Sequence, residues 1–354
     1  MKICLITDLH IGARNDSHAF SDYFAKFYEK VLFPYLDRHK INTAICLGDT
    51  FDRRKYINYV SFDKSREMLF DPMFQRNIDF HMIVGNHDTS YKNINFPNSP
   101  ELLLGNYPNI TIYPEPTVVE FDDVPIQFIP WINSGNYDKS MEALKTSPAQ
   151  ILMGHLEISG FEMYKGFASI DGDFKKELLS RFDIVFSGHF HHKSDDGQIF
   201  YLGTPYEITW NDWNDSRGFH IFDTDTRELE RIVNPYSIFK KIYYDDTHPS
   251  FGEDIDMASF KDKYVKLIVV NKKDLYKFDM FVDNLFKADA FDVKIIEDFS
   301  DLDASNVSDD IVNNTEDTIT LLDRYIDELP LMLDKGRLKN TMKTLYNEAQ
   351  DLEL

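Results

Sequence analysis

Short apolar runs that stop abruptly at polar residues dominate the first 190 residues of the chain. A continuous apolar run of this length is typical of a β-strand buried on both faces. The runs are KICLITD (2–8), TAICLGD (43–49), FHMIVGNHD (80–88), AQILMGHL (149–156) and FDIVFSGH (182–189). We therefore expect five buried strands.

The segments between and after these runs have the patterns of helices and hairpins. Residues 20–39 form an amphipathic helix in this interpretation, because their aromatic and branched residues repeat at helical spacing. That apolar face belongs either to the core or to a dimer interface. The other predicted elements are a helix at 61–70, a hairpin at 117–131 and strands at 199–205 and 218–225. Alternating strands and helices predict an α/β sandwich over residues 1–235.

The apolar pattern loosens after residue 235, and the rest of the chain divides by composition. Residues 236–299 contain a strand, a helix and a strand, at 264–271, 275–288 and 291–298, and predict a small α+β cap domain. An acidic linker is expected at 300–314. The last segment, 315–354, is a predicted pair of helices with apolar stripes at 315–329 and 337–354.

The bulk composition limits the classes of protein that fit. The chain has 354 residues, of which 43% are hydrophobic, enough for a sizeable core in more than one domain. No apolar stretch approaches the ~20 residues of a membrane-spanning helix, and Asp8 interrupts the first run too early for a signal peptide. Cys4 and Cys46 lie inside apolar runs and predict buried free thiols in a reducing compartment, so we expect a cytoplasmic location.

All five apolar runs end in residue types that bind metals. The ends are Asp8-Leu9-His10, Gly48-Asp49, Gly85-Asn86-His87-Asp88, Gly154-His155 and Gly188-His189-Phe190-His191. Functional groups of an α/β sheet collect at the carboxyl ends of its strands, and Asp, His and Asn suit Mn, Fe or Zn. Each motif alone also fits a turn, a helix cap or a strand end. Together, in this order, they predict a metal centre, and the glycines are expected to let the backbone turn sharply.

The order D-x-H, G-D-x-x-D, G-N-H-D, G-H, G-H-x-H resembles the calcineurin-like metallophosphoesterases. The resemblance covers about the first two-thirds of the chain and implies a four-layer α/β/β/α sandwich with two divalent metals, Mn²⁺ before Mg²⁺. It implies a first metal on Asp8, His10 and His191, a second on Asn86, His155 and His189, and Asp49 between them.

The same resemblance assigns the remaining polar residues of the motifs. His87 would be the catalytic histidine, and Asp88 would orient it. His192 falls out of phase with His189 and His191 and is expected to be a bystander. Asp52 stands where some relatives carry His, a position implicated there in exonuclease chemistry, so the preferred substrate end stays open.

Several flanking segments resemble the SbcD-type nuclease subunits that work with SMC-like ATPases, including the one in the MRN repair complex. They are ITDLHIG, GDTFDRR, GHLEISG, YLGTPYEITW and RGFHIFD. The short length and the helical tail resemble the recombination endonuclease subunits of tailed bacteriophages. This resemblance implies a two-metal DNA nuclease, exonuclease or endonuclease, in recombination, repair and end processing. It also implies a homodimer within a heterotetramer, in which the C-terminal helices bind an SbcC-type ATPase, in the host cytoplasm.

The net charge of −22 opposes DNA binding unless bound metals or a basic partner supply positive potential. Loop lysines near the motifs either contact phosphates or are ordinary solvated side chains; they are Lys165, Lys175, Lys176 and Lys193. Two alternatives therefore stay open. One is a phosphoesterase for small molecules or phosphoproteins, and the other is a metal-free scaffold on the same fold, against which all seven ligand positions are filled.

Overall fold

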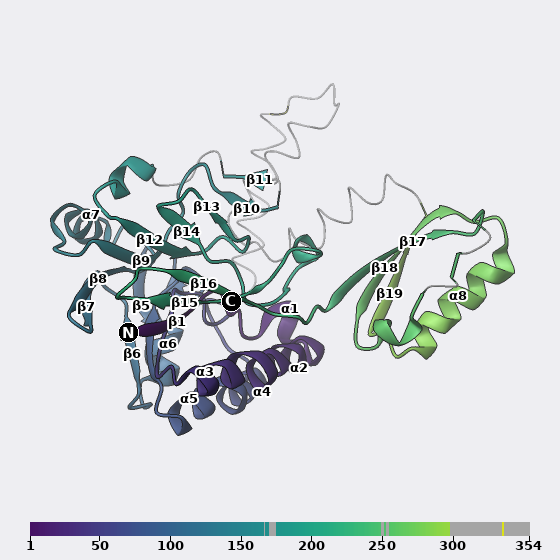
Figure 1. Cartoon of the computed structure of the whole chain (residues 1–354), viewed down its shortest axis with the longest axis horizontal. Coiled ribbons are helices and arrows are strands. Elements are labelled where there is room, and N and C mark those ends of the chain that lie inside the picture. The colour runs from purple at the N-terminus through teal and green to yellow at the C-terminus, as the bar shows by residue number, and fades with distance from the viewer. Residues whose placement is uncertain (166, 170–174, 249–250, 253–254, 298–334, 336–354) are drawn as a thin grey trace. The chain divides into compact units, whose positions relative to one another are not determined.

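The computed structural model describes residues 1–165, 167–169, 175–248, 251–252, 255–297 and 335. A six-stranded sheet carries the first three predicted strands, in the order β16-β15-β1-β2-β3-β6 (Figure 1). Its strands are β1 (Lys2–Ile6), β2 (Thr43–Cys46), β3 (Asp79–Ile83), β6 (Ile110–Tyr113), β15 (Gly218–Asp223) and β16 (Leu229–Val233). The four strands β1, β2, β3 and β6 are parallel, and β15 and β16 extend the sheet antiparallel.

A second six-stranded sheet carries the other two predicted strands, in the order β13-β14-β12-β9-β8-β7. Its strands are β7 (Thr117–Phe121), β8 (Val124–Ile129), β9 (Ile151–His155), β12 (Ile184–Gly188), β13 (Ser194–Asp195) and β14 (Ile199–Tyr201). Strands β8, β9, β12 and β14 are parallel. The predicted hairpin at 117–131 is confirmed as β7 and β8.

Three apolar clusters show how the layers pack. One joins the facing sides of the two sheets, through residues such as Leu5, Ile83 and Met153. A second covers the outer face of the first sheet with helices, and a third covers the outer face of the second sheet with α7 (Tyr137–Thr146). The expected α/β/β/α sandwich is therefore confirmed.

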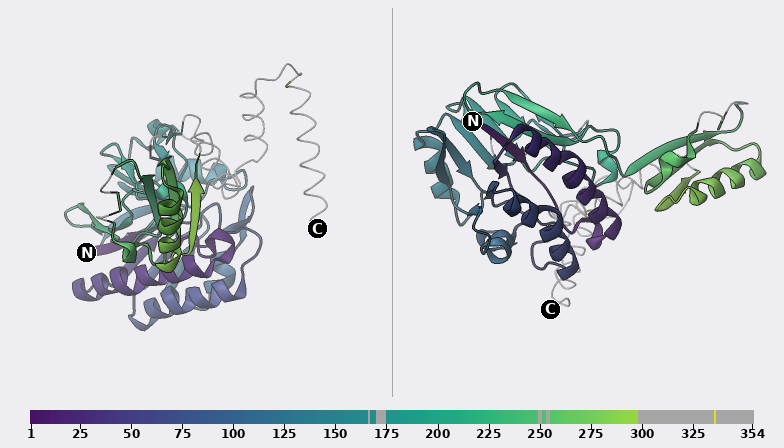
Figure 2. Two further views of the ribbon diagram at one scale, coloured as in Figure 1. Left: turned by 90° about the vertical axis from the view of Figure 1, so that its right-hand side faces the viewer. Right: turned by 60° about the horizontal axis from the view of Figure 1, so that its bottom comes forward.

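The predicted helix at 20–39 is present as α2 (His18–Phe27), a π-helical turn (Tyr28–Leu32) and α3 (Phe33–His39). Its aromatic face lies in the core against the first sheet, which decides between the two interpretations of that face. The predicted helix at 61–70 lies within α4 (Tyr59–Ser65), a π-helical turn (Arg66–Phe70) and α5 (Asp71–Gln75). Figure 2 shows these two helical stretches, purple and blue, side by side.

Shorter elements connect the layers. They are α1 (Ala13–Asp16), β4 (Thr89–Tyr91), β5 (Ile94–Asn98), α6 (Ser99–Leu104), β10 (Glu162–Tyr164), β11 (Phe167–Ala168) and the 3₁₀ turns Lys176–Leu179, Trp210–Asp212 and Met257–Phe260. Cys4 and Cys46 are buried free thiols, as expected. In the described part of the chain, no helix is long and apolar enough to span a bilayer.

A small three-stranded sheet follows the sandwich, in the order β17-β18-β19. The predicted strand, helix and strand are confirmed as β18 (Tyr264–Asn271), α8 (Leu275–Lys287) and β19 (Asp292–Ile296). Strand β17 (Phe239–Asp245), which pairs parallel to β18, was not predicted from the sequence. The predicted linker at 300–314 and helix pair at 315–354 lie outside the described residues, apart from residue 335.

One polar side chain is enclosed between the two sheets. His220 on β15 pairs with Leu5 of β1, so it lies on the face of the first sheet that packs against the second. It is 1% exposed, and neither ring nitrogen has a hydrogen-bond partner among the described residues. Burial and then the nearby charge of Arg231 lower the pKa of His220 to about 3.

His220 should therefore make the folded protein sensitive to acid. Its imidazole titrates near 6.5 in the unfolded chain but at about 3 in the folded protein, so the unfolded chain gains a proton first and stability falls as pH drops below about 6.5. Between pH 7.5 and 5, His220 should cost about 2 kcal/mol. Urea unfolding in EDTA should show a correspondingly smaller loss for His220→Leu. The exposed control His248→Gln should behave as wild type, and an unchanged loss in His220→Leu would contradict this account.

Candidate metal centre

The carboxyl ends of five strands from both sheets meet at one edge of the sandwich. The backbone segments that follow β1 and β2 continue to pair with each other. Asp8 N–H donates to the Gly48 carbonyl at 3.0 Å, and His10 N–H donates to the Asp49 carbonyl at 3.1 Å. The second sheet joins them where the backbone N–H of His189 donates to the Asp8 carboxylate at 3.1 Å. The seven predicted ligands are brought together in two adjoining groups that share Asp49.

Four of the candidate ligands have left-handed backbone conformations. The φ angles are 52° at Asp8, 42° at His10, 51° at Asp49 and 86° at His189. Non-glycine residues adopt this region seldom and at a cost, and such residues cluster at functional sites. All four residues lie in the loops that follow strands β1, β2 and β12.

The glycines before the ligands are present mainly for space. Only Gly48 has a positive φ, of 110°, as the expected sharp turn requires. A Cβ on Gly85 would lie 2.2 Å from the Asp49 carboxylate, and one on Gly188 would lie 2.1 Å from the Thr7 hydroxyl. Gly85 and Gly188 thus make room for side chains from the segments that follow β2 and β1.

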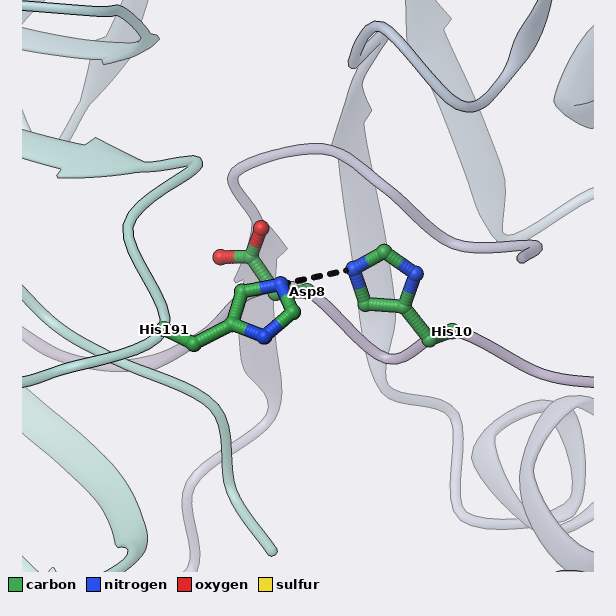
Figure 3. Close-up of side chains that lie close together, drawn as sticks. All are labelled: Asp8, His10 and His191. Carbon is green, nitrogen blue, oxygen red and sulfur yellow. Dashed lines mark hydrogen bonds between the residues drawn. The ribbon is translucent and has the colours of Figure 1, made fainter. Parts of the chain in front are cut away.

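The first group of ligands contains Asp8, His10 and His191. Figure 3 shows the three side chains pointing toward one another, with the Nε2 atoms of His10 and His191 3.0 Å apart. The Nδ1 of His10 donates to the Asp52 carboxylate at 3.2 Å, so Nε2 is the ring nitrogen that faces the other two side chains. Burial and the positive charge of neighbours hold the pKa of His191 well below its usual range, so its ring is neutral.

The second group contains Asp49, His155 and His189, with Asn86 between the two histidines. The Asn86 Oδ1 lies 2.8 Å from His155 Nε2 and 3.1 Å from His189 Nδ1. Asp49 Oδ2 lies 3.2 Å from the same His155 Nε2. Burial opposes ionisation of Asp49, but the imidazoles of His155 and His87 hold its pKa well below the usual range, so it carries a negative charge.

The protonation of His155 shows that these residues fit a cation. Its Nδ1 lies 2.8 Å from the Leu47 carbonyl oxygen, which can only accept a hydrogen bond, so Nδ1 carries a proton. In a neutral ring the other nitrogen, Nε2, then has the lone pair. That lone pair would face the oxygens of Asp49 and Asn86. Without a metal, a second proton relieves this repulsion: burial lowers the pKa of His155, but the Asp49 carboxylate outweighs burial and raises it to about 9. A divalent cation bound by Nε2 and both oxygens satisfies the same atoms.

A family model described as calcineurin-like phosphoesterase matches residues 1–193, which contain every candidate ligand. The chain belongs to this family. It is therefore a phosphoester hydrolase of a family that uses divalent metals.

Two curated relatives extend the similarity beyond the catalytic motifs. Exonuclease subunit 1 of Enterobacteria phage T4 is 35% identical over 353 residues, 99% of each chain. The SbcD component of the nuclease SbcCD of Staphylococcus epidermidis is 22% identical over 259 residues, 65% of this chain and 67% of that protein. The solved structure of Pseudomonas putida nuclease MPE is 16% identical over 65% of this chain and 87% of that one, at a TM-score of 0.28. The family assignment rests on the sequence matches.

The catalytic histidine expected for this phosphoesterase lies beside the first group of ligands. The His87 Nδ1 donates to the backbone carbonyl of Asp52 at 2.6 Å, and its half-buried ring meets that of His10 edge-on at 4.8 Å. Asp52 therefore holds two histidines, His10 by its carboxylate and His87 by its carbonyl. Burial lowers the pKa of His87, so the free ring is neutral and offers a lone pair at Nε2.

The expectation that Asp88 orients His87 is wrong. Its buried carboxylate accepts three backbone N–H groups instead, from Gly85 at 2.9 Å, Thr50 at 2.9 Å and Phe51 at 3.2 Å. These bonds tie the loop after β3 to the loop after β2. Burial and the nearby charge of Asp49 raise the pKa of Asp88 to about 7. Asp88 thus supports the loops that carry Asp49 and Asn86.

Several groups at the edge of the site were not predicted from the sequence. The Trp131 ring, just after β8, lies 5.0 Å from the His189 ring, and Glu157 Oε2 lies 3.5 Å from His189 Nε2. Trp131 ends the apolar run of the predicted hairpin, and this position at a strand end was the available signal. His192 does not face the ligands, as expected, but it pairs with Asp215 at 2.7 Å.

Asp88→Ala should lower stability and metal affinity together, because three buried N–H groups would lose their acceptor at about 1 kcal/mol or more each. We expect a loss of about 3 kcal/mol in urea unfolding and at least a tenfold weaker Mn²⁺ affinity by titration calorimetry. The matched control is Asp223→Ala, which removes a carboxylate that accepts two N–H groups in the β15–β16 turn. A stable Asp88→Ala protein with wild-type Mn²⁺ affinity would show that Asp88 does not hold these loops.

Proposed function

We propose that the chain is a Mn²⁺-dependent DNA nuclease that hydrolyses phosphodiester bonds at a two-metal site. The observation that carries the proposal is the convergence of His155 Nε2 with the Asn86 Oδ1 at 2.8 Å and the Asp49 Oδ2 at 3.2 Å, a donor set that suits a divalent cation. The nuclease names of both curated relatives support the substrate class. Asp, Asn and His ligands suit Mn²⁺, with Mg²⁺ as the alternative.

The proposed metal ligands follow the two groups in the structure. Asp8, His10 and His191 hold one ion, Asn86, His155 and His189 hold the other, and Asp49 bridges them. Divalent ions held there would supply Lewis acidity for the phosphate and for an attacking water. The chain supplies the orientation: Leu47 and Asp52 fix the tautomers of His155 and His10.

His87 is the proposed catalytic histidine. Its Nδ1 proton is engaged by the Asp52 carbonyl, so only Nε2 faces the substrate. An anionic phosphate beside the ring raises the affinity of Nε2 for a proton. His87 then steadies the phosphate and protonates the leaving oxygen.

The segment after Asp52 is the proposed contact for the bases and backbone of DNA. Lys55, Tyr56 and Tyr59 are exposed, with Tyr59 87% exposed and Tyr56 64%. Exposed aromatic rings beside positive charge bind single strands by stacking. Of the loop lysines, Lys176 and Lys193 are less suited, because Lys176 pairs with Asp196 at 3.4 Å and Lys193 with Asp195 at 2.6 Å.

The partner proposed for this nuclease is an SMC-like ATPase of the SbcC type. The name of the Staphylococcus relative, a subunit of SbcCD, supports such a partner. The C-terminal segment, 315–354, is the proposed docking element, in a heterotetramer with two nuclease subunits in the host cytoplasm. A basic ATPase surface would offset the net charge of −22.

A phosphoesterase for small molecules or phosphoproteins is the second candidate. The net charge of −22 favours it, because DNA is repelled by an acidic surface.

We expect Mn²⁺ to support cleavage of short single-stranded DNA and EDTA to abolish it. His87→Ala should keep both metal ions but lower kcat by a factor of about 100 or more, because His87 acts on the proton and not on the metal. Asp49→Ala should lose metal, because it removes the bridging carboxylate. Gel-based cleavage and elemental analysis measure the two effects.

The wild type separates the candidates through its substrates. Faster Mn²⁺-dependent hydrolysis of a small chromogenic monoester than of DNA would favour the small-molecule candidate, and full activity after metal stripping would end the two-metal proposal. Equal metal loss in His87→Ala and Asp49→Ala would contradict their separate roles.

Tyr59→Ala should weaken binding of single-stranded DNA about 5- to 150-fold, since stacking of one base contributes ~1–3 kcal/mol. Hydrolysis of a small chromogenic diester should not change, because Tyr59 does not belong to the ligand groups. Fluorescence anisotropy with a labelled oligonucleotide in Ca²⁺ measures the affinity. Tyr137→Ala on α7, also an exposed tyrosine, is the control, and equal affinities for all three proteins would exclude Tyr59 as a contact.

A further inference from the structure

The backbone around His191 is held from outside the ligand groups. The His191 carbonyl accepts the backbone N–H of Thr204 at 3.1 Å. A Cβ on Gly203 would lie 2.8 Å from that carbonyl and 2.9 Å from the Lys193 nitrogen, so the two segments pack backbone against backbone. The segment after β14 therefore forms one wall of the loop that carries His191.

A buried guanidinium closes the same contact. Arg217 lies just before β15 and is 3% exposed. Its Nη1 donates to the His191 carbonyl and, at 2.7 Å, to the Thr204 hydroxyl. Its Nη2 donates to Asp212 at 2.8 Å and to Asp215 at 2.7 Å. A planar guanidinium can serve four acceptors in fixed directions, which a lysine ammonium cannot.

The two carboxylates that hold Arg217 are themselves fixed. The other oxygen of Asp212 accepts the backbone N–H groups of Ile208 at 2.7 Å and Thr209 at 2.8 Å. Asp215 also binds the His192 Nδ1 at 2.7 Å, next to His191 in the chain. The guanidinium is thus fixed on one side by the turn that contains Asp212, and on the other side it donates to the backbone of the His191 loop.

We propose that Arg217 is a positioning residue for the first metal ion, acting through the His191 backbone. This inference rests on the proposed metal site. His191 offers its Nε2 lone pair opposite the Nε2 of His10, and a backbone shift at His191 moves that atom out of register with Asp8 and His10. His189 is fixed separately, because its N–H donates to the Asp8 carboxylate. Loss of Arg217 therefore weakens the first ion more than the second.

The test compares Arg217→Gln with wild type in Mn²⁺ titrations followed by calorimetry and by electron paramagnetic resonance of the bound ion. We expect wild type to bind two ions. The variant should bind one ion with an affinity within a few-fold of wild type and the other about 10- to 100-fold more weakly, the range seen when groups that orient metal ligands are removed. Arg227→Gln, which removes an exposed arginine paired with Asp183, is the control and should bind as wild type.

The outcomes separate this inference from the proposed function. Failure of wild type to bind two Mn²⁺ ions would refute the two-metal site itself. If a folded Arg217→Gln protein binds both Mn²⁺ ions with wild-type affinity, the role of Arg217 is wrong, but the two-metal site is not affected. If circular dichroism shows that Arg217→Gln does not fold, Arg217→Lys decides, because it keeps the charge between Asp212 and Asp215 but not the fork that reaches His191. Wild-type binding of both ions by Arg217→Lys would also overturn the inference.

Discussion

The Asp8 carboxylate is the point on which the rest of the site depends. Asp8 lies two residues after β1, in the middle of the first sheet, and its carboxylate accepts the backbone N–H of His189 from the second sheet, with the Thr7 hydroxyl as a further donor at 2.7 Å. The same hydrogen bond therefore joins the two sheets and holds the candidate ligands Asp8 and His189 in place. Burial raises the pKa of Asp8, so the charged form persists only where donors or cations surround it.

Most of the sandwich could be predicted because its strands are buried on both faces. An apolar run as short as AQILMGHL predicts a buried strand, and five of its residues do form β9. Strand β17 escaped prediction for the opposite reason. Its sequence, FKKIYYD, holds a pair of lysines and a pair of tyrosines and has only two buried positions, so its pattern resembles no buried strand, and its pairing with β18 shows that it belongs to a sheet.

The candidate ligands could be predicted by type and order, but their geometry could not. Strand periodicity says nothing about a left-handed turn at Asp8 or His189, because such turns depend on the surrounding contacts. The error over Asp88 has the same origin. Adjacency to His87 implied a contact, yet its carboxylate reaches the backbone of Thr50, 38 residues away in sequence. Supporting groups of this kind are visible only once distant loops are in place.

The sequence separation of the ligands also orders events during synthesis. His10 and His191 are 181 residues apart, so the first group of ligands is incomplete until more than half of the chain has been made. At ~5–20 residues per second, the early ligands wait on the order of 10–40 s for their partners. During that time Asp8 and His10 lack the ligand that the second sheet supplies to the first group. In the proposed site, an ion held by ligands from both sheets would therefore mark a chain whose sandwich has closed, and metal loading would be a late step in the maturation of the enzyme.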